Sequence, residues 1–257
     1  MMSDPVELVL ADDVAHLTLN RPDAANTINL AVARRFRDHM RNLERQPPAA
    51  VVIAARGRAF CGGGDVREMS EAPDLPTYLD LLAETFHEGL LLLASLDALI
   101  FAAIGGAAAG GGLGLALNAD VRIASPRARF LTAYEAVGLT PDSGVSFLLP
   151  RVVGLGRAAE MSALSGVMDA ATAARSGLVA EVVETDPAAR AAELASSATG
   201  RSQAHMSATR RLLRGDTDGQ YAAALDAERA ALVAAAASTS AASLIRGFVH
   251  RQKEKQA

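Results

Sequence analysis

The sequence has no tryptophan, few aromatic residues of any kind and a single cysteine. Aromatic residues make up 4% of the 257 positions, too few for the stacked-ring platforms that bind single-stranded nucleic acid. One cysteine, Cys61, excludes an intrachain disulfide framework and is typical of a reducing compartment. No cluster of cysteine and histidine has the spacing of metal ligands. We therefore expect a cytoplasmic protein without a metal site.

An excess of positive charge is also missing, and we expect no amino-terminal targeting segment. The formal net charge is -4, which gives no general case for a nucleic-acid partner. The chain begins MMSDPVELVL, with acids and a proline where a secretory signal peptide has basic and then apolar residues. Half of the residues are hydrophobic, enough for a sizeable core. We expect either one large domain or one domain with a helical appendage, with no membrane partner.

One long uncharged stretch needs a separate explanation. Residues 98–117 carry no charge over twenty positions, the length of a membrane span. Six of these twenty positions are glycine, which disfavours a helix. We favour a buried strand at 99–103, a glycine loop, and a helix that begins near Gly111 or Gly112. The free N–H groups at such a helix start form a site for negative charge.

The rest of the chain alternates between strand and helix patterns before it becomes mostly helical. Strands are predicted at 6–10, 14–19, 50–55 and 121–124, and helices at 30–43 and 76–96. A strand–loop–helix unit occurs twice, at 50–70 and 98–118, which predicts βαβ units with right-handed crossovers. The fold class is therefore α/β. We divide the chain into a core at 1–195 and a helical region at 196–257, acting as one functional unit.

The two glycine loops, 62–64 and 110–112, allow three interpretations. A phosphate-binding P-loop needs Gly-Lys-Ser/Thr at the helix start, and neither loop has it. A dinucleotide site needs G-x-G-x-x-G, and both loops lack the last glycine. The third interpretation is an oxyanion hole, in which backbone N–H groups from two loops stabilise one developing negative charge.

The residues around both loops favour the third interpretation. Residues 57–69 (GRAFCGGGDVREM) and 102–125 (AAIGGAAAGGGLGLALNADVRIAS) resemble the two oxyanion loops of the crotonase, or enoyl-CoA hydratase/isomerase, superfamily. The turn RPDAAN at 21–26 is similar to the early turn of that family that contacts coenzyme A, and 137–154 and 176–183 are similar to its later stretches. The similarity covers essentially the whole chain in order.

This resemblance implies a fold, a ligand and an assembly. The fold is a crotonase-like spiral of ββα units with a helical C-terminal trimerisation region, often paired into hexamers. The substrate is an acyl-CoA thioester, and no cofactor is implied beyond the coenzyme A that the substrate carries. The oxyanion donors are the backbone N–H groups of Cys61 and Gly111. The implied substrate and CoA contacts are Ala24, Ala25, Ala59, Phe60, Gly63, Asp65, Val66, Gly110, Tyr134, Phe248 and Arg251.

The glutamate pair with which hydratases of the family activate water is missing. The matching positions are Gly114 and Tyr134. Glu135 is one residue out of register, and one residue rotates a helical side chain by about 100°. We therefore expect Glu135 to point elsewhere, as a solvated acid, and expect little addition of water.

One acid does match the family pattern. Asp142 lies at the position of the aspartate of isomerase-type members, and its alternative role is an N-cap for the helix predicted after it. A single carboxylate suffices for a double-bond shift, because it can take a proton from one carbon and return it to another. The sequence therefore predicts an enoyl-CoA isomerase with Asp142 as the acid/base.

Other functions stay open at this point. Hydration could use Glu135 or Asp142 despite the register, and Asp142 could instead act as a nucleophile in hydrolytic or dehalogenating attack. A catalytically silent CoA-binding or RNA-associated member is the alternative from another class. His87 could be a general base, although its neighbours Glu84 and Glu88 favour a partly exposed polar face.

Overall fold

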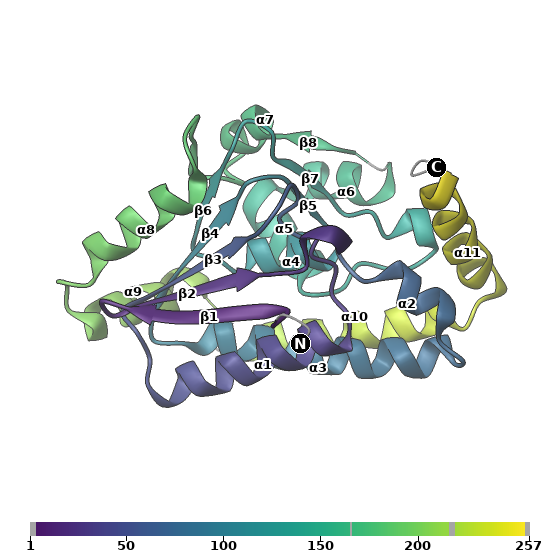
Figure 1. Ribbon diagram of the computed structural model, residues 1–257, viewed down its shortest axis with the longest axis horizontal. Coiled ribbons are helices and arrows are strands. Elements are labelled where there is room, and N and C mark those ends of the chain that lie inside the picture. The colour runs from purple at the N-terminus through teal and green to yellow at the C-terminus, as the bar shows by residue number, and fades with distance from the viewer. Residues whose placement is uncertain (1–3, 165, 216–218, 255–257) are drawn as a thin grey trace.

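A computed structural model describes residues 4–164, 166–215 and 219–254 and confirms the α/β class (Figure 1). The main sheet has six strands in the order β1-β2-β3-β4-β6-β9. They are β1 (Val6–Ala11), β2 (Val14–Leu19), β3 (Ala50–Ala55), β4 (Leu99–Ile104), β6 (Val121–Ala124) and β9 (Glu181–Val182). The hairpin β1–β2 is antiparallel, and every other neighbouring pair in this sheet is parallel, as the alternating pattern predicts.

The continuous apolar run of β3 is explained by burial on both faces of the sheet. Val51 and Ile53 belong to the large core formed with α1 (Leu30–Arg45) and α3 (Leu75–Ser95). Ala50 and Val52 point to the opposite face and join a smaller core with α8 (Pro187–Ala198). Since side chains alternate along a strand, neither face can be polar, and the sequence reads as an unbroken hydrophobic segment.

The uncharged stretch at 98–117 is not a helix. It forms β4, the short strand β5 (Ala107–Ala109) and α4 (Gly111–Leu117), so the predicted strand, glycine loop and helix start are confirmed. β5 was not predicted. It heads a second sheet with β7 (Arg129–Leu131) and β8 (Met168–Asp169). Among the described helices none alone is long and apolar enough to cross a membrane, and α10 with α11 passes only as a pair bent by 83°.

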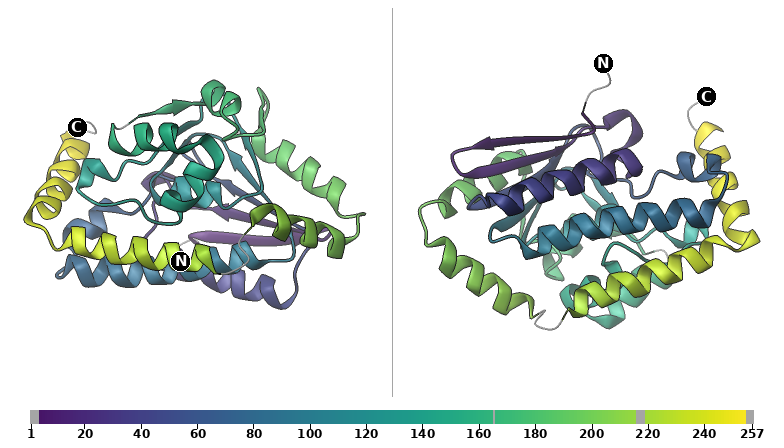
Figure 2. Two further views of the ribbon diagram at one scale, coloured as in Figure 1. Left: turned by 180° about the vertical axis from the view of Figure 1, so that it is seen from behind. Right: turned by 90° about the horizontal axis from the view of Figure 1, so that it is seen from below.

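The carboxyl-terminal helices return to the core and cover it. Figure 2 shows α10 (Gln220–Ala236) lying along α3, with α1 on its other side, so that the three helices form one layer under the sheet. α11 (Thr239–Glu254) then turns and packs against α2 (Val66–Glu71) and the short helix η2 (Glu135–Val137). Residues more than a hundred positions apart therefore meet around the glycine loops. The remaining helices are η1 (Pro22–Ala24), α5 (Val145–Val153), α6 (Leu155–Ala163), α7 (Ala170–Arg175) and α9 (Gln203–Arg214).

One buried arginine fastens α9 to the end of α3. The Arg210 side chain is 3% exposed and pairs with Asp120 at 2.7 Å. It also donates to the carbonyl oxygens of Leu93, Ala94 and Leu96, which the end of a helix leaves without intrahelical partners. Its neighbour Arg211 forms a surface ion pair with Asp97 and no other ion pair with the described residues.

We expect Arg210→Ala to lower the free energy of unfolding by about 2–3 kcal/mol, because several carbonyls lose their donor and Asp120 keeps the longer ion pair to Arg214 and the N–H of Ile100. Arg211→Ala, the matched control, should cost less than about 1 kcal/mol. Urea denaturation of both variants measures the difference. Equal losses would show that Arg210 contributes no more than a surface ion pair.

Candidate active site

Two glycine loops from separate parts of the chain meet at the edge of the second sheet. Cys61 forms a β-bridge with Ala108 of β5, which draws the first loop against the second. Gly63 has φ +88°, and a Cβ there would lie 2.9 Å from the carbonyl oxygen of Ala109. Only glycine can therefore occupy this position without a shift of the backbone. The loops predicted from their glycines do converge.

The first predicted oxyanion donor is wrong. The Cys61 N–H donates to the carbonyl oxygen of Ala107 at 3.0 Å, and the Gly62 N–H donates to Ala25 at 2.9 Å. Both groups are occupied in the strand-like pairing of the loop. The N–H of Gly64, three residues after Cys61, makes no hydrogen bond with the described residues. The available donor of the first loop is therefore Gly64.

The second predicted donor is available. Gly111 is the first residue of α4, where a backbone N–H has no intrahelical partner. No acceptor among the described residues approaches it. Gly64 and Gly111 line the same cavity, so the site offers two backbone donors from two loops.

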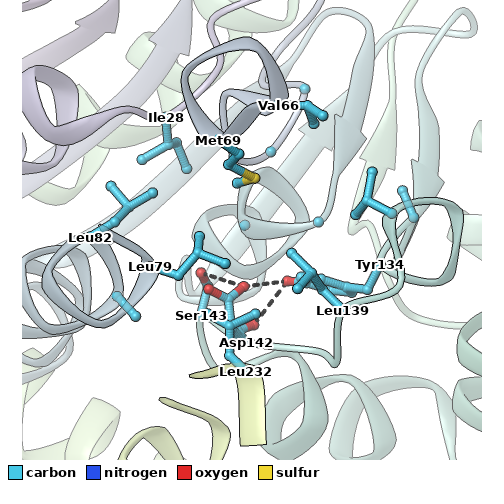
Figure 3. Close-up of a pocket in the computed structure, with 18 of the residues that line it drawn as sticks. Ile28, Val66, Met69, Leu79, Leu82, Tyr134, Leu139, Asp142, Ser143 and Leu232 are labelled. Carbon is cyan, nitrogen blue, oxygen red and sulfur yellow. Dashed lines mark hydrogen bonds between the residues drawn. The ribbon is translucent and has the colours of Figure 1, made fainter. Parts of the chain in front are cut away.

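The cavity between the loops has a volume of about 100 Å³ and is mostly apolar. Figure 3 shows side chains from several elements closing around it, with Asp142 and Tyr134 turned toward each other on one side. The apolar side chains of the lining are those of Ile28, Val66, Met69, Leu79, Leu82, Ala83, Phe86, Ala133, Val137, Leu139, Leu232 and Phe248. Thr132, Tyr134, Asp142 and Ser143 supply the polar side chains of the lining. Such a cavity suits an apolar chain that carries one polar, reactive end.

The Asp142 carboxylate has one occupied and one free oxygen. Tyr134 donates its hydroxyl hydrogen bond to Asp142 Oδ1 at 2.7 Å, and Ser143 Oγ lies 3.1 Å from the same oxygen (Figure 3). No hydrogen bond to Oδ2 is made by the described residues. Burial, and next the charge of Asp142, raise the pKa of Tyr134 well above its ordinary value. The tyrosine therefore remains a donor, and Oδ2 is the oxygen left for chemistry.

The alternative role of Asp142, an N-cap, is not what the structure shows. The N-cap residue of α5 is Gly144, which has no side chain that could cap the helix. The backbone N–H groups at this helix start donate instead to the carboxylate of Glu228 in α10. The distance is 2.7 Å from Gly144 and 2.8 Å from Ser146. Ser146 Oγ also donates to Glu228. The cap is therefore a glutamate more than eighty residues away, and the Asp142 carboxylate is left facing the cavity.

His87 is buried rather than partly exposed. It is 5% exposed, and its Nε2 accepts the N–H of Ser143 at 3.1 Å. The ring also hydrogen-bonds the backbone of Leu225. Burial is the main cause that lowers the pKa of His87, in spite of the nearby Asp142 charge. A neutral imidazole that accepts a backbone hydrogen bond holds the chain next to Asp142, and the ring does not line the cavity.

Neither of the two positions that would carry hydratase glutamates holds an acid, and at Gly114 there is no room for one. A Cβ on Gly114 would lie 2.4 Å from the carbonyl oxygen of Ser143. Tyr134 occupies the other position and binds Asp142. Glu135 is absent from the cavity lining, and its Oε2 is buried without a hydrogen-bond partner among the described residues. Within the cavity lining, Asp142 is the carboxylate.

The remaining residues implied by the resemblance fall into two groups. The cavity lining includes Gly63, Val66, Gly110, Tyr134 and Phe248. Outside the lining are Ala24, Ala25, Ala59, Phe60, Asp65 and Arg251. Asp65 forms an ion pair with Arg21 at 3.0 Å and caps α2, so it shapes the first loop. Substrate contacts by these outer residues stay predictions.

Two structural residues of the site were missed although the sequence carries a signal for each. His87 lies four residues after Ala83 and three before Leu90, on the buried face of α3. Glu228 lies three residues after Leu225 and four before Leu232, on the buried face of α10. A polar residue at an apolar position of a helix predicts a buried partner.

Comparisons with known proteins agree across the chain. A family model described as enoyl-CoA hydratase/isomerase matches residues 10–256. The chain is 38% identical over 194 residues to "Probable enoyl-CoA hydratase EchA14" of Mycobacterium tuberculosis, which covers 75% of this chain and 74% of that protein. It is 34% identical over 183 residues to the 1,2-epoxyphenylacetyl-CoA isomerase of Escherichia coli, covering 70% of each. A crystal structure of an enoyl-CoA hydratase from Mycobacterium avium subsp. paratuberculosis has a TM-score of 0.83, with 27% identity and 96% of both chains covered.

We expect that Gly114→Glu, which would restore one missing acid, unfolds or weakens the protein and adds no hydratase activity. Gly114→Ala alone should cost about 1–3 kcal/mol, because its Cβ has no space beside Ser143. Gly156→Ala in α6 is the matched control, since no atom lies within 4 Å of its added Cβ. Thermal melts and a hydration assay test this pair. A stable Gly114→Glu protein that hydrates enoyl-CoA would contradict the packing argument.

Stability should fall with rising pH because of Glu228. Burial, and more weakly the Asp142 charge, raise the pKa of Glu228 from 4.5 to about 7 in the folded protein. The folded state therefore holds this proton more tightly than the unfolded state does. The resulting stability is complete below about pH 4.5 and is lost as the pH rises through about 7. Glu228→Gln removes the effect, so the stability difference between the two proteins should change by up to about 3 kcal/mol across this window. Urea denaturation at several pH values would contradict this if both proteins gave parallel curves.

Proposed function

Because the chain belongs to the enoyl-CoA hydratase/isomerase family, we propose that it moves a carbon–carbon double bond within an enoyl-CoA thioester. The observation that carries the proposal is the single lining carboxylate, Asp142, which has one free oxygen in an apolar cavity beside two unoccupied backbone donors. Each part has a defined task in a proton shift.

The backbone donors would act on the thioester carbonyl. Removal of a proton next to that carbonyl, or two carbons farther along an unsaturated chain, places negative charge on the carbonyl oxygen. The N–H groups of Gly64 and Gly111 are free to stabilise this charge, and Gly111 also opens a helix, where the local dipole favours an anion. Because both are backbone groups of rigid loops, they need no rearrangement during the reaction.

Asp142 would carry the proton. Its Oδ2 takes the proton from one carbon of the allylic system and returns it to the carbon at the other end. Tyr134 and Ser143 hold Oδ1 by hydrogen bonds, so the carboxylate has a fixed direction throughout. General acid–base catalysis by such a positioned group supplies about 10²–10⁴-fold in rate.

The site supports isomerisation better than hydration. Addition of water in this family uses two carboxylates, and here one position is Gly114, packed against Ser143, and the other is Tyr134. The lining from α3, α10 and α11 is aliphatic apart from two phenylalanines, Phe86 and Phe248, which favours an aliphatic acyl chain. Assembly into trimers or pairs of trimers remains a prediction.

Asp142→Asn tests the assignment. We expect it to lower the isomerase rate by about 10²–10⁴-fold while a saturated acyl-CoA still binds, because the amide keeps the shape but cannot take the proton. The assay compares 2-enoyl, 3-enoyl and dienoyl thioesters for bond shift and for water uptake. Arg211→Ala, on the surface far from the cavity lining, serves as the purification control.

Full activity in Asp142→Asn would overturn the proposal, as would a wild-type protein that hydrates 2-enoyl-CoA at rates usual for enzymes. Uptake of ¹⁸O from labelled water into the Asp142 carboxylate during turnover would indicate a nucleophilic role instead.

A further inference from the structure

The turn that carries Asp142 has an unfavourable backbone conformation, and most of its N–H groups have no acceptor within the turn. Ser143 has φ +60° and Gly144 has φ +82°, so two successive residues adopt left-handed conformations. For a serine this region is sparsely populated and costs free energy unless the surroundings impose it. The Asp142 carbonyl accepts the N–H of Val145 at 3.1 Å, but the donors of Ser143, Gly144 and Ser146 all need acceptors from elsewhere.

Two buried side chains supply these acceptors. His87 of α3 accepts from Ser143, and Glu228 of α10 accepts from Gly144 and Ser146, each oxygen of the carboxylate taking a different backbone group. Glu228 is 5% exposed, so water does not readily replace it. Because Glu228 accepts two backbone N–H groups of the turn and His87 accepts one, Glu228 is the main external support of the turn.

We propose that Glu228 is a positioning residue for the reaction, acting through the backbone of residues 144–146 to aim the Asp142 carboxylate at the substrate. This inference rests on the proposed role of Asp142. It assigns part of the active-site geometry to α10, in the helical region that follows the core. Glu228 is not a catalytic residue in this account, because it is absent from the cavity lining.

Loss of this support should reduce the rate without reducing affinity. The apolar lining would bind the acyl chain and the two loops would bind the thioester, and Glu228 belongs to neither. A misplacement of about 1 Å in a catalytic group can cost 10²-fold in rate. In Glu228→Gln one carboxylate oxygen becomes an NH₂ group that faces a backbone donor, so the turn must shift. We expect kcat to fall by about 10–100-fold, with the Kd for a saturated acyl-CoA changed less than about twofold.

The test is a double-mutant cycle with Asp142→Asn. If Glu228 acts through Asp142, Glu228→Gln should lower kcat in the wild-type background and have little further effect once Asp142 is replaced. A merely structural effect, such as a smaller folded fraction, would lower the rate by the same factor in both backgrounds and would overturn the inference.

A neighbouring residue provides the matched control. Arg229 ties the same helix to α3 through Asp80 and Glu84 but makes none of the hydrogen bonds of the turn. Arg229→Gln should weaken the contact between α10 and α3 and leave kcat within about twofold. Equal losses of kcat in Glu228→Gln and Arg229→Gln would mean that packing of α10, not the turn, is responsible.

Glu228→Asp covers the case in which the glutamine variant does not fold. It keeps the charge but is one methylene too short to reach both backbone donors at once, so an intermediate loss of kcat is expected, and an unchanged kcat would contradict the inference. Full activity in Asp142→Asn would contradict the proposed function itself. If Asp142→Asn is inactive and Glu228→Gln is fully active, only the proposed role of Glu228 is contradicted.

Discussion

The hydrogen bond from Tyr134 to Asp142 Oδ1 is the interaction on which the account of this site depends. A carboxylate in an apolar cavity can rotate, share its charge between both oxygens, or bind a backbone donor at the nearby helix start. The tyrosine occupies one oxygen at 2.7 Å, and Glu228 takes the helix donors that would otherwise compete. What is left is one oxygen with a fixed direction, facing the space between two glycine loops.

The fold explains why these groups meet. The parallel sheet ends in loops at one edge, the short strand β5 draws the two glycine loops together, and α10 returns along α3 to reach the start of α5. Burial stabilises the hydrogen bonds of His87 and Glu228, because little water reaches these side chains to replace their partners. The helices that follow the core thus form part of the wall of the cavity, through Leu232 and Phe248, as well as part of its support.

The sequence was sufficient to predict the fold and to single out Asp142, which the structure places in the cavity lining, but not to predict the hydrogen bonds within the loops. Long apolar runs and helical spacing identified the hairpin, β3, β4 and α3 to within about two residues. Cys61 was predicted to be a donor from the family resemblance. The sequence does not show β5, a strand of three alanines in which the Ala107 carbonyl accepts the Cys61 N–H. The helical spacing of Glu228 and His87 indicates that each is buried, but their partners lie more than fifty positions away and follow from packing, so no local pattern identifies which residues they bind.

The central claim, that one oxygen of Asp142 removes and returns the same proton, is tested most directly by following that proton. A 3-enoyl-CoA carrying deuterium at the carbon next to the thioester would be converted in ordinary water in a single turnover, and the product examined by mass spectrometry. The account predicts that a measurable fraction of the deuterium appears at the carbon that was the far end of the original double bond, because the same carboxylate serves both carbons. A product formed at the full wild-type rate with solvent hydrogen alone at that carbon would contradict it and would require a second proton donor.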